Sequence, residues 1–265
     1  MGRHYKIMAE RLPYSRRDFR TNEEYLTRWL VDMGFAAPFG LGLIEGNLGG
    51  GKSLFGYTIM WWLKRLFGYK ITLDQMPRPA FGQYTYFDVP SDILKEKELI
   101  DKIAERSDEW EGPEVEQLKL YKCRAFYDEF YKIAHNRRGM SNLIIEFGDI
   151  VKQSRHACTF ILCAMPHKNE VDVKAIDAYV TVDIRAAWSM IKPDTANYIV
   201  YNRASMVESV FTIFGPNYYG LYNSQNPIRS RKNIDAKEYK KWQKKLSGIG
   251  TEDEEKSERK SYARS

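Results

Sequence analysis

Short apolar runs alternate along the chain with longer segments that carry apolar residues on one face. The apolar runs predict buried strands at residues 41–45, 70–73, 84–87, 122–127, 159–164 and 179–184. The longer segments predict helices at residues 21–33, 54–67, 91–106, 114–120, 142–155 and 171–179. This alternation predicts an α/β fold with a mostly parallel central sheet flanked by helices.

The pattern changes after residue 184. Apolar residues there predict strands at 199–200, 209–214 and 218–222. The sequence Gly215-Pro216-Asn217 between the last two indicates a turn, so we expect them to form a hairpin.

The helix predicted at 21–33 has one apolar face. Tyr25, Trp29 and Met33 recur at i, i+4 and i+8. This spacing favours packing against the main sheet over a contact with another subunit.

These features divide the chain into four parts. Residues 1–37 form an N-terminal extension with one helix, and residues 38–228 form the core. Residues 229–247 form a basic helical segment. Residues 248–265 are polar and mixed in charge, so we expect them to be disordered.

A glycine-rich motif lies between the strand at 41–45 and the helix at 54–67. Its sequence G-x-x-x-x-G-K-S is the Walker A phosphate-binding loop, formed by Gly46, Asn47, Leu48, Gly49, Gly50, Gly51, Lys52 and Ser53. The glycines let backbone N–H groups surround phosphates at a helix N-terminus, where Leu54 follows. Lys52 would reach the β- and γ-phosphates of ATP, and the Ser53 hydroxyl would bind Mg²⁺. The alternative is a glycine-rich turn with a chance Lys-Ser pair, but strand, loop and helix stand in the order that the motif requires.

An acidic pair follows the strand at 122–127. Asp128 and Glu129 at the end of an apolar strand form the Walker B pattern. Asp128 would hold Mg²⁺ through water, and Glu129 would orient and activate the attacking water. Arg124 is an unusual residue in a buried strand, and a solvated acidic pair at a strand end is the alternative.

Composition adds a hint about partners. The net charge is +6, with a pI near 9.0, which weakly favours a polyanionic partner. The segment 229–245 alone accounts for that excess, since it holds two acidic residues against Arg229, Arg231, Lys232, Lys237, Lys240, Lys241, Lys244 and Lys245. A solvated amphipathic helix explains this segment equally well.

Cysteine usage and hydropathy bear on location. Cys123, Cys158 and Cys163 show no metal-binding spacing and suggest buried thiols in a reducing compartment. Residues 1–20 lack the apolar stretch of a signal peptide. The longest apolar run, 54–63, is about half the ~20 residues needed to cross a bilayer. We therefore expect a cytoplasmic protein without a membrane-spanning segment.

The order of the motifs resembles that of the FtsK–HerA superfamily of DNA-pumping ATPases, over roughly residues 40–225. The resemblance is strongest to the small members carried by archaeal viruses and plasmids, which are relatives of the poxvirus-type packaging ATPases and of the Zot-like phage proteins. The matching segments are GNLGGGKS (46–53), YDEF (127–130), RRGMSN (137–142), QSRH (153–156), TFILCA (159–164), EVD (170–172) and GLYNS (220–224).

The resemblance implies a RecA-like P-loop NTPase fold and a ring oligomer, usually a hexamer, that moves double-stranded DNA with ATP and Mg²⁺. In such a ring each ATP site lies between subunits, and a neighbour contributes an arginine finger. Arg155 in QSR is the first candidate for that role, with Arg138 and Arg185 as weaker ones. A surface or phosphate-contacting arginine is the alternative for each.

One position departs from the family pattern. A glutamine that senses the γ-phosphate usually follows the strand after Walker B, whereas this chain has Met165-Pro166-His167 there. A neutral imidazole can donate a hydrogen bond, so His167 is a candidate sensor, and a structural histidine is the alternative.

The leading functional hypothesis is an ATP-driven DNA translocase that packages a viral genome into a capsid. Such a protein would work in the host cytoplasm or with the virion, and would dock on a capsid vertex or a membrane-associated viral protein. The phage-export Zot-like members carry a transmembrane helix after the ATPase domain, and none is visible here. Two alternatives stay open: a P-loop phosphotransferase acting on a small molecule, and a nucleotide-switched structural protein without motor activity.

Overall fold

The computed structural model describes residues 10–47, 49–89, 91–106, 110, 112–128, 130, 141–165, 176–189 and 194–222. Within them, nine strands form one sheet in the order β1-β9-β8-β7-β2-β6-β5-β3-β4. The strands are β1 (Glu10–Arg11), β2 (Gly40–Glu45), β3 (Lys70–Leu73), β4 (Thr85–Tyr86), β5 (Cys123–Tyr127), β6 (Phe160–Met165), β7 (Val180–Trp188), β8 (Thr195–Asn202) and β9 (Val207–Phe214).

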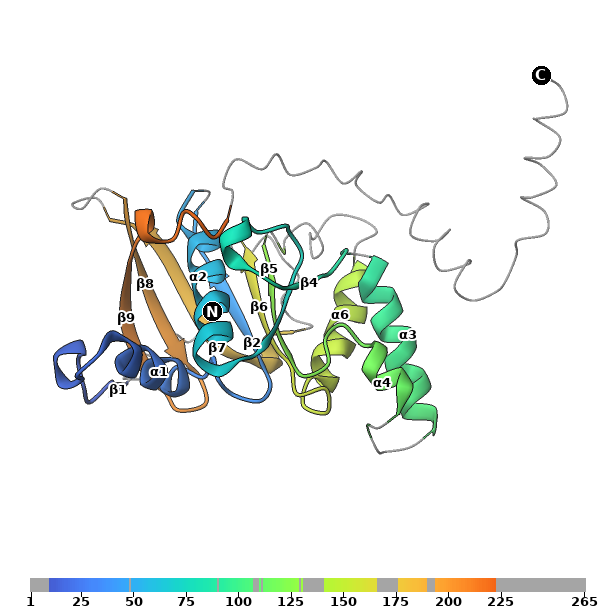
Figure 1. Cartoon of the computed structure of the whole chain (residues 1–265). Coiled ribbons are helices and arrows are strands. Elements are labelled where there is room, and N and C mark those ends of the chain that lie inside the picture. The colour runs from blue at the N-terminus through green and yellow to red at the C-terminus, as the bar shows by residue number, and fades with distance from the viewer. Residues whose placement is uncertain are drawn as a thin grey trace, which may run out of the picture.

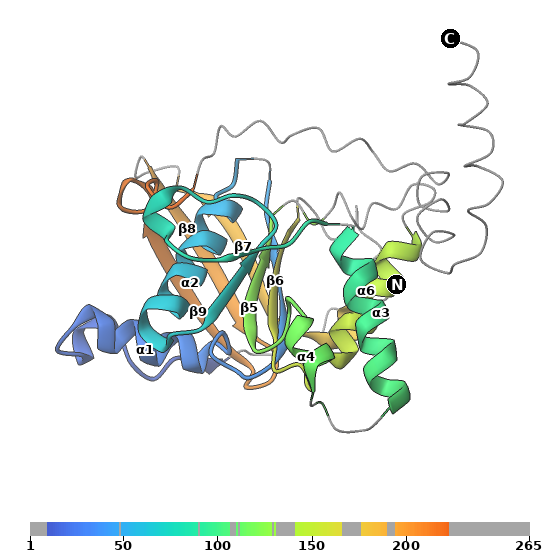
Figure 2. The same ribbon diagram turned by 45° about the vertical axis from the view of Figure 1, so that its right-hand side comes forward.

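Five helices flank this sheet among the described residues. They are α1 (Asn22–Asp32), α2 (Lys52–Phe67), α3 (Ser91–Arg106), α4 (Pro113–Gln117) and α6 (Ser141–Gln153). Figures 1 and 2 show α1 and α2 on one side of the sheet, with α3, α4 and α6 grouped beside β5 and β6. The helices and the strands at 41–45, 70–73, 122–127 and 159–164 agree with the sequence predictions to within about three residues.

The direction of the parallel strands determines which loops lie at the same edge of the sheet. β7, β2, β6, β5, β3 and β4 run parallel to one another, whereas β8 is antiparallel to both of its neighbours. The mostly parallel sheet predicted from the sequence is therefore confirmed. Because the carboxyl ends of parallel strands lie at one edge, the loops that follow β2, β3, β5, β6 and β7 share that edge.

The central strands are buried on both faces. Along β6, Phe160, Leu162 and Ala164 join the core beneath α1 and α2. Ile161 and Cys163 join the core beneath α3 and α6. This double burial explains why β6 reads as an unbroken apolar run rather than as an alternating one.

Helix α1 packs against the sheet, as its apolar face predicts. Thr21 begins it with a capping box, in which its hydroxyl accepts from Glu24 N and the Glu24 carboxylate accepts from Thr21 N. Trp29 is fully buried, its ring lies 4.4 Å from that of Phe211 on β9, and its indole donates to Ser209 Oγ at 2.9 Å. Burial of such a ring stabilises the fold by about 2–3 kcal/mol.

The predicted hairpin at 215–217 is wrong. The hairpin lies between β8 and β9, where the Asn202 side chain accepts from Ala204 N at 3.0 Å and so stabilises the turn. Gly215–Asn217 instead forms a 3₁₀ helix, because Pro216 has no N–H for a strand ladder. The chain after it packs against α2, with the Tyr222 ring stacked on Tyr57 at 5.3 Å.

Two predicted strands are longer in the structure, and other predicted segments lie partly or wholly outside the described residues. The strand predicted at 179–184 extends to Trp188, and that at 199–200 covers Thr195–Asn202. Of the helix predicted at 171–179, only a 3₁₀ turn at Asp177–Tyr179 lies among the described residues. The basic segment 229–247 and the tail 248–265 lie outside them, so their assignment stays a prediction.

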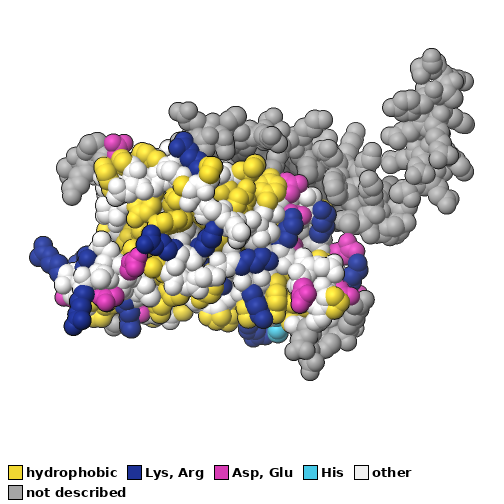
Figure 3. Space-filling view, in the orientation of Figure 1, with side chains coloured by type: hydrophobic (Ala, Val, Ile, Leu, Met, Phe, Trp, Pro, Cys, Tyr) yellow, Lys and Arg dark blue, Asp and Glu magenta, His cyan; other side chains and the backbone are white. Residues whose placement is uncertain are grey.

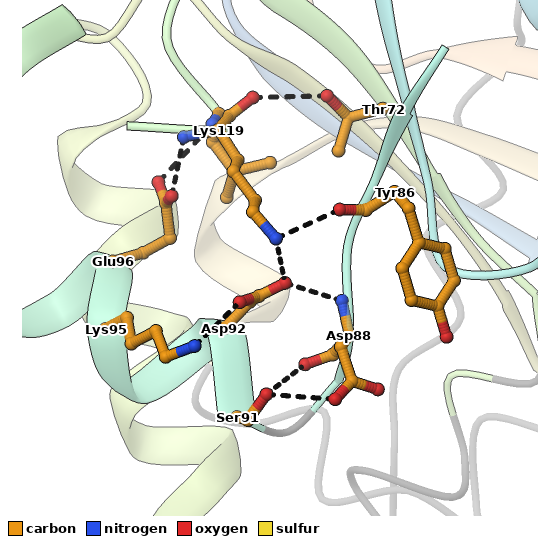
Figure 4. Close-up of polar contacts among 9 residues, drawn as sticks. Thr72, Tyr86, Asp88, Ser91, Asp92, Lys95, Glu96 and Lys119 are labelled. Carbon is orange, nitrogen blue, oxygen red and sulfur yellow. Dashed lines mark hydrogen bonds and ion pairs between the residues drawn. The ribbon is translucent and has the colours of Figure 1, made fainter. Parts of the chain in front are cut away.

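A polar cluster attaches α3 to the edge of the sheet (Figure 4). Lys119 Nζ donates to buried Asp92 at 2.5 Å and to Tyr86 O on β4 at 3.1 Å. Its backbone N donates to Glu96 Oε1 at 2.6 Å, and its carbonyl accepts from Thr72 on β3 at 3.1 Å. Burial raises the pKa of Glu96 to about 7. Lys119 thus fixes the outermost strand β4 and its neighbour β3 to the helical layer.

Candidate phosphate-binding site

The Walker A loop occupies the predicted place between β2 and α2. Gly51 is the N-cap of α2 at φ +88°, a backbone conformation that favours glycine. A Cβ at Gly46 would lie 2.6 Å from Ala186 O on β7, so no other residue fits there without a shift. The helix therefore begins directly at the loop, and its first N–H groups open onto the space that an anion would occupy.

Lys52 lies over its own loop. Its Nζ donates to Gly46 O at 2.8 Å and to Asn47 O at 2.9 Å. Exchange of these carbonyls for phosphate oxygens would place the ammonium group on an anion in the loop. Ser53 is partly exposed in the first turn of α2. The glycines, the lysine and the hydroxyl together fit a nucleotide triphosphate with its Mg²⁺.

The Walker B carboxylate shares the edge with this loop. Asp128 directly follows β5, which is separated from β2 only by β6. At about 4.8 Å per strand, β5 lies roughly 10 Å from β2. This span suits a metal ion held between Asp128 and a phosphate in the loop. Glu129 lies outside the described residues, although Phe130 N donates to Ala164 O at 2.8 Å and ties the turn to β6.

A second carboxylate at this edge was missed by the sequence analysis. Asp74 follows β3, is only 6% exposed, and accepts the Asp128 N–H at its Oδ1 at 3.0 Å. Burial raises the pKa of Tyr57 on α2, with the charges of Asp128 and Asp74 adding to the shift. The signal was a single aspartate directly after an apolar strand, in the same place that Asp128 occupies after β5.

The two remaining candidates differ in position. His167 lies outside the described residues, but β6 ends at Met165 between the loop strand and the Asp128 strand. Arg155 follows α6 and precedes β6, so it lies at the amino ends of the strands, about 20 Å from the loop along β6. It is exposed, and its guanidinium lies 3.3 Å from the His156 ring. Arg155 therefore does not reach the phosphate loop of its own chain.

Of the weaker candidates, Arg185 is exposed on β7 and pairs in register with Glu45, the last residue of β2. It thus lies at the edge with the phosphate loop. Arg138 lies outside the described residues.

The described residues hold neither a cluster of metal-ligating side chains nor a membrane-spanning helix. No group of three or more His, Cys, Asp and Glu side chains is placed to hold a metal within them. No helix in this part of the chain is long and apolar enough to cross a bilayer. A Mg²⁺ site with one or two protein ligands plus phosphates does not need such a group.

No family model and no curated protein matches the chain. Solved structures do: the N-terminal domain of zonular occludens toxin from Neisseria meningitidis is 16% identical over 70% of this chain and 99% of its own, with a TM-score of 0.46. The genome packaging NTPase B204 from Sulfolobus turreted icosahedral virus 2, in complex with ATP-gammaS, is 11% identical over 66% and 97%, with a TM-score of 0.44.

The flagellar accessory protein FlaH from Methanocaldococcus jannaschii is 17% identical over 71% of this chain and 93% of its own, with a TM-score of 0.42. The strand order of the chain itself identifies the fold. Walker A lies between β2 and α2, and β6 separates β2 from the Walker B strand. The chain has a RecA-like P-loop NTPase fold and is similar in structure to these three proteins.

Proposed function

We propose that this protein is an ATPase that moves double-stranded DNA, and that it packages a viral genome into a capsid as a ring-shaped homo-oligomer. The observation that carries the ATPase part is the shared edge of the sheet, where the Walker A loop and Asp128 lie two strands apart. Lys52 would contact the β- and γ-phosphates. Ser53 and Asp128 would hold Mg²⁺, which supplies charge neutralisation when bound.

The remaining roles are proposed from the order of the residues along the chain. Glu129 would orient and deprotonate the water that attacks the γ-phosphate. His167, just beyond β6, would contact that phosphate from between the two Walker strands. Arg155 would serve a neighbouring subunit, since it lies far from its own loop.

The DNA part of the proposal is supported by the order of motifs and by the basic segment 229–245. On the face that Figure 3 shows, Lys and Arg side chains are spread among hydrophobic and neutral ones. Segment 229–245 carries the excess positive charge of the chain and is the candidate for phosphate contacts, which need only positive charge and no reading of bases.

The decisive experiment measures ATP turnover with and without double-stranded DNA. DNA-stimulated turnover supports the translocase. Turnover that needs a small-molecule acceptor and ignores DNA would favour a phosphotransferase instead. ATP binding without turnover would favour the nucleotide-switched structural protein, which would then dock on a capsid vertex or a membrane-associated viral protein.

Replacing Glu129 by glutamine is expected to leave ATP bound while turnover falls by about 10²-fold or more, because the base that orients the water is lost. Equilibrium binding and single-turnover kinetics measure the two effects. Glu116→Gln is the matched control, since Glu116 is exposed on α4, away from the candidate site. Normal turnover in Glu129→Gln would show that the Walker B assignment is wrong.

DNA affinity is expected to be indifferent to sequence and to fall steeply with salt, because counterion release dominates such binding. Removal of residues 229–265 should weaken it. Removal of 248–265 alone should not, since that tail carries nearly balanced charge. Filter binding at several salt concentrations measures both, and unchanged affinity after the longer deletion would place the contact on other loops.

A further inference from the structure

The phosphate loop contacts the antiparallel pair of strands β7 and β8, here called the β7–β8 hairpin, as well as the flanking β2 and α2. A Cβ at Gly46 would lie 2.6 Å from Ala186 O, and a Cβ at Gly51 would lie 2.9 Å from Tyr198 Oη and 3.0 Å from Ala196 Cβ. Ala186 pairs with Tyr198 across β7 and β8, and Trp188 pairs with Ala196. Two alternate cross-strand pairs, on the same face of the sheet, therefore lie against the loop.

Two of these residues donate hydrogen bonds to loop carbonyls. The Tyr198 hydroxyl donates to Gly51 O at 2.9 Å, and the Trp188 indole N–H donates to Gly49 O. Lys52 donates to Gly46 O and Asn47 O. When an anion binds, the Lys52 ammonium group would leave these two carbonyls for phosphate oxygens. Tyr198 and Trp188 would keep their hydrogen bonds to the loop.

Fixing a carbonyl also fixes the neighbouring N–H. In a trans peptide the C=O of one residue and the N–H of the next point in opposite directions. The Gly51 carbonyl accepts from the Tyr198 hydroxyl at 2.9 Å and also from Phe55 N at 3.0 Å in the first turn of α2. Tyr198 is thus a second donor that holds this peptide, with the Lys52 N–H turned the opposite way at the N-terminus of α2, where phosphate would bind. A rotated peptide would instead present an oxygen to the anion and repel it.

The packing around Tyr198 holds its hydroxyl group in a fixed position. It is fully buried, and its ring packs on Phe55 of α2 with centroids 4.5 Å apart. Burial raises the pKa of its hydroxyl, which keeps its proton at all physiological pH values. Trp188 is 38% exposed, so its N–H is the more adaptable of the two donors.

We propose that the β7–β8 hairpin holds the phosphate loop in its anion-binding conformation before nucleotide arrives, with Tyr198 and Trp188 as positioning residues. The inference rests on the proposed function in one respect, that the loop binds the phosphates of ATP. It adds that side chains of β7 and β8, the first and second strands from β2 in the sheet, set the affinity of the loop for phosphate.

The test uses Tyr198→Phe and Trp188→Phe in the full chain, with ATP and inorganic tripolyphosphate as probes. Tyr198→Phe removes one hydroxyl and keeps the ring on Phe55. Loss of one hydrogen bond should lower the affinity for both probes roughly threefold to tenfold. The double variant should lose more than either single one, because the two donors hold different carbonyls.

Tyr201→Phe is the matched control, because Tyr201 lies three residues along β8 and therefore on its other face. It should bind both probes as the unaltered chain does. Affinity is measured well below the unfolding temperature, where a purely structural loss of stability leaves the folded population and its affinity unchanged. Trp188→Phe, at a partly exposed site, keeps the test valid if Tyr198→Phe folds poorly.

The outcomes separate the two proposals. Failure of the unaltered chain to bind ATP and tripolyphosphate would refute the ATPase proposal itself. Tight binding by the unaltered chain, with the same affinity in both variants, would overturn the positioning role and leave the ATPase intact. A loss for ATP alone, with tripolyphosphate unaffected, would also overturn it, since the hairpin would then act on the nucleoside.

Discussion

Replacing Lys52 by alanine is expected to reduce ATP turnover below detection. Lys52 carries the positive charge that would meet the β- and γ-phosphates, and a charge-assisted hydrogen bond to an anion is among the stronger polar contacts in proteins. The change also frees Gly46 O and Asn47 O, which accept from Lys52 Nζ. Phosphate release assays measure the turnover.

Two further variants separate charge from structure. Lys52→Met keeps the length of the side chain and loses the charge, so it should be as inactive as alanine. Arg65→Ala removes a positive charge from the same helix, where the exposed Arg65 pairs with Glu23 at 2.8 Å. A surface pair of this kind contributes only about 0–1 kcal/mol, so Arg65→Ala should retain turnover. Activity in Lys52→Met would contradict the proposed contact.

The site around Lys52 was predictable because its signals are local. A strand, a glycine loop and a helix follow one another without interruption, and the helix ends at Gly68 with φ +70° as its sequence predicts. Helix α3 was likewise predicted at its observed bounds from the spacing of Ile93, Leu94, Ile100 and Ile103, which are all buried. Such patterns need no knowledge of the partner surface.

The parts that depend on distant residues were not predictable. Only Ile199-Val200 forms an apolar run in β8, and the strand gains its full length from pairing with β7 and β9. Arg124 looked out of place in a strand because its partners are remote: its guanidinium donates to Ala37 O at 2.8 Å and lies 3.9 Å from the Tyr69 ring centre. The contact of Asp74 with Asp128 depends on the strand order in the same way.

Replacing Arg155 by alanine is expected to leave ATP affinity nearly intact while turnover falls on the order of 10³-fold. An arginine finger stabilises charge mainly in the transition state, so binding is spared. Because Arg155 lies at the far end of β6 from its own loop, the effect requires a neighbouring subunit. Lys152→Ala is the matched control, since Lys152 lies about one turn earlier on α6 and pairs with Asp149 on the surface.

Mixing two inactive proteins tests whether the site is shared between subunits. An Arg155→Ala subunit keeps its Walker residues, and a Glu129→Gln subunit keeps its finger. In a mixed ring, some sites combine the Walker residues of the first with the finger of the second, so turnover should recover in part, provided that mixed rings form and that not every site has to be active. Recovery would establish both the shared site and the ring.

If Arg155→Ala turns over ATP normally, the finger assignment is wrong, and Arg138 and Arg185 become the next residues to replace. Arg185 comes first, because it is exposed beside Glu45 at the edge of the sheet where the phosphate loop begins.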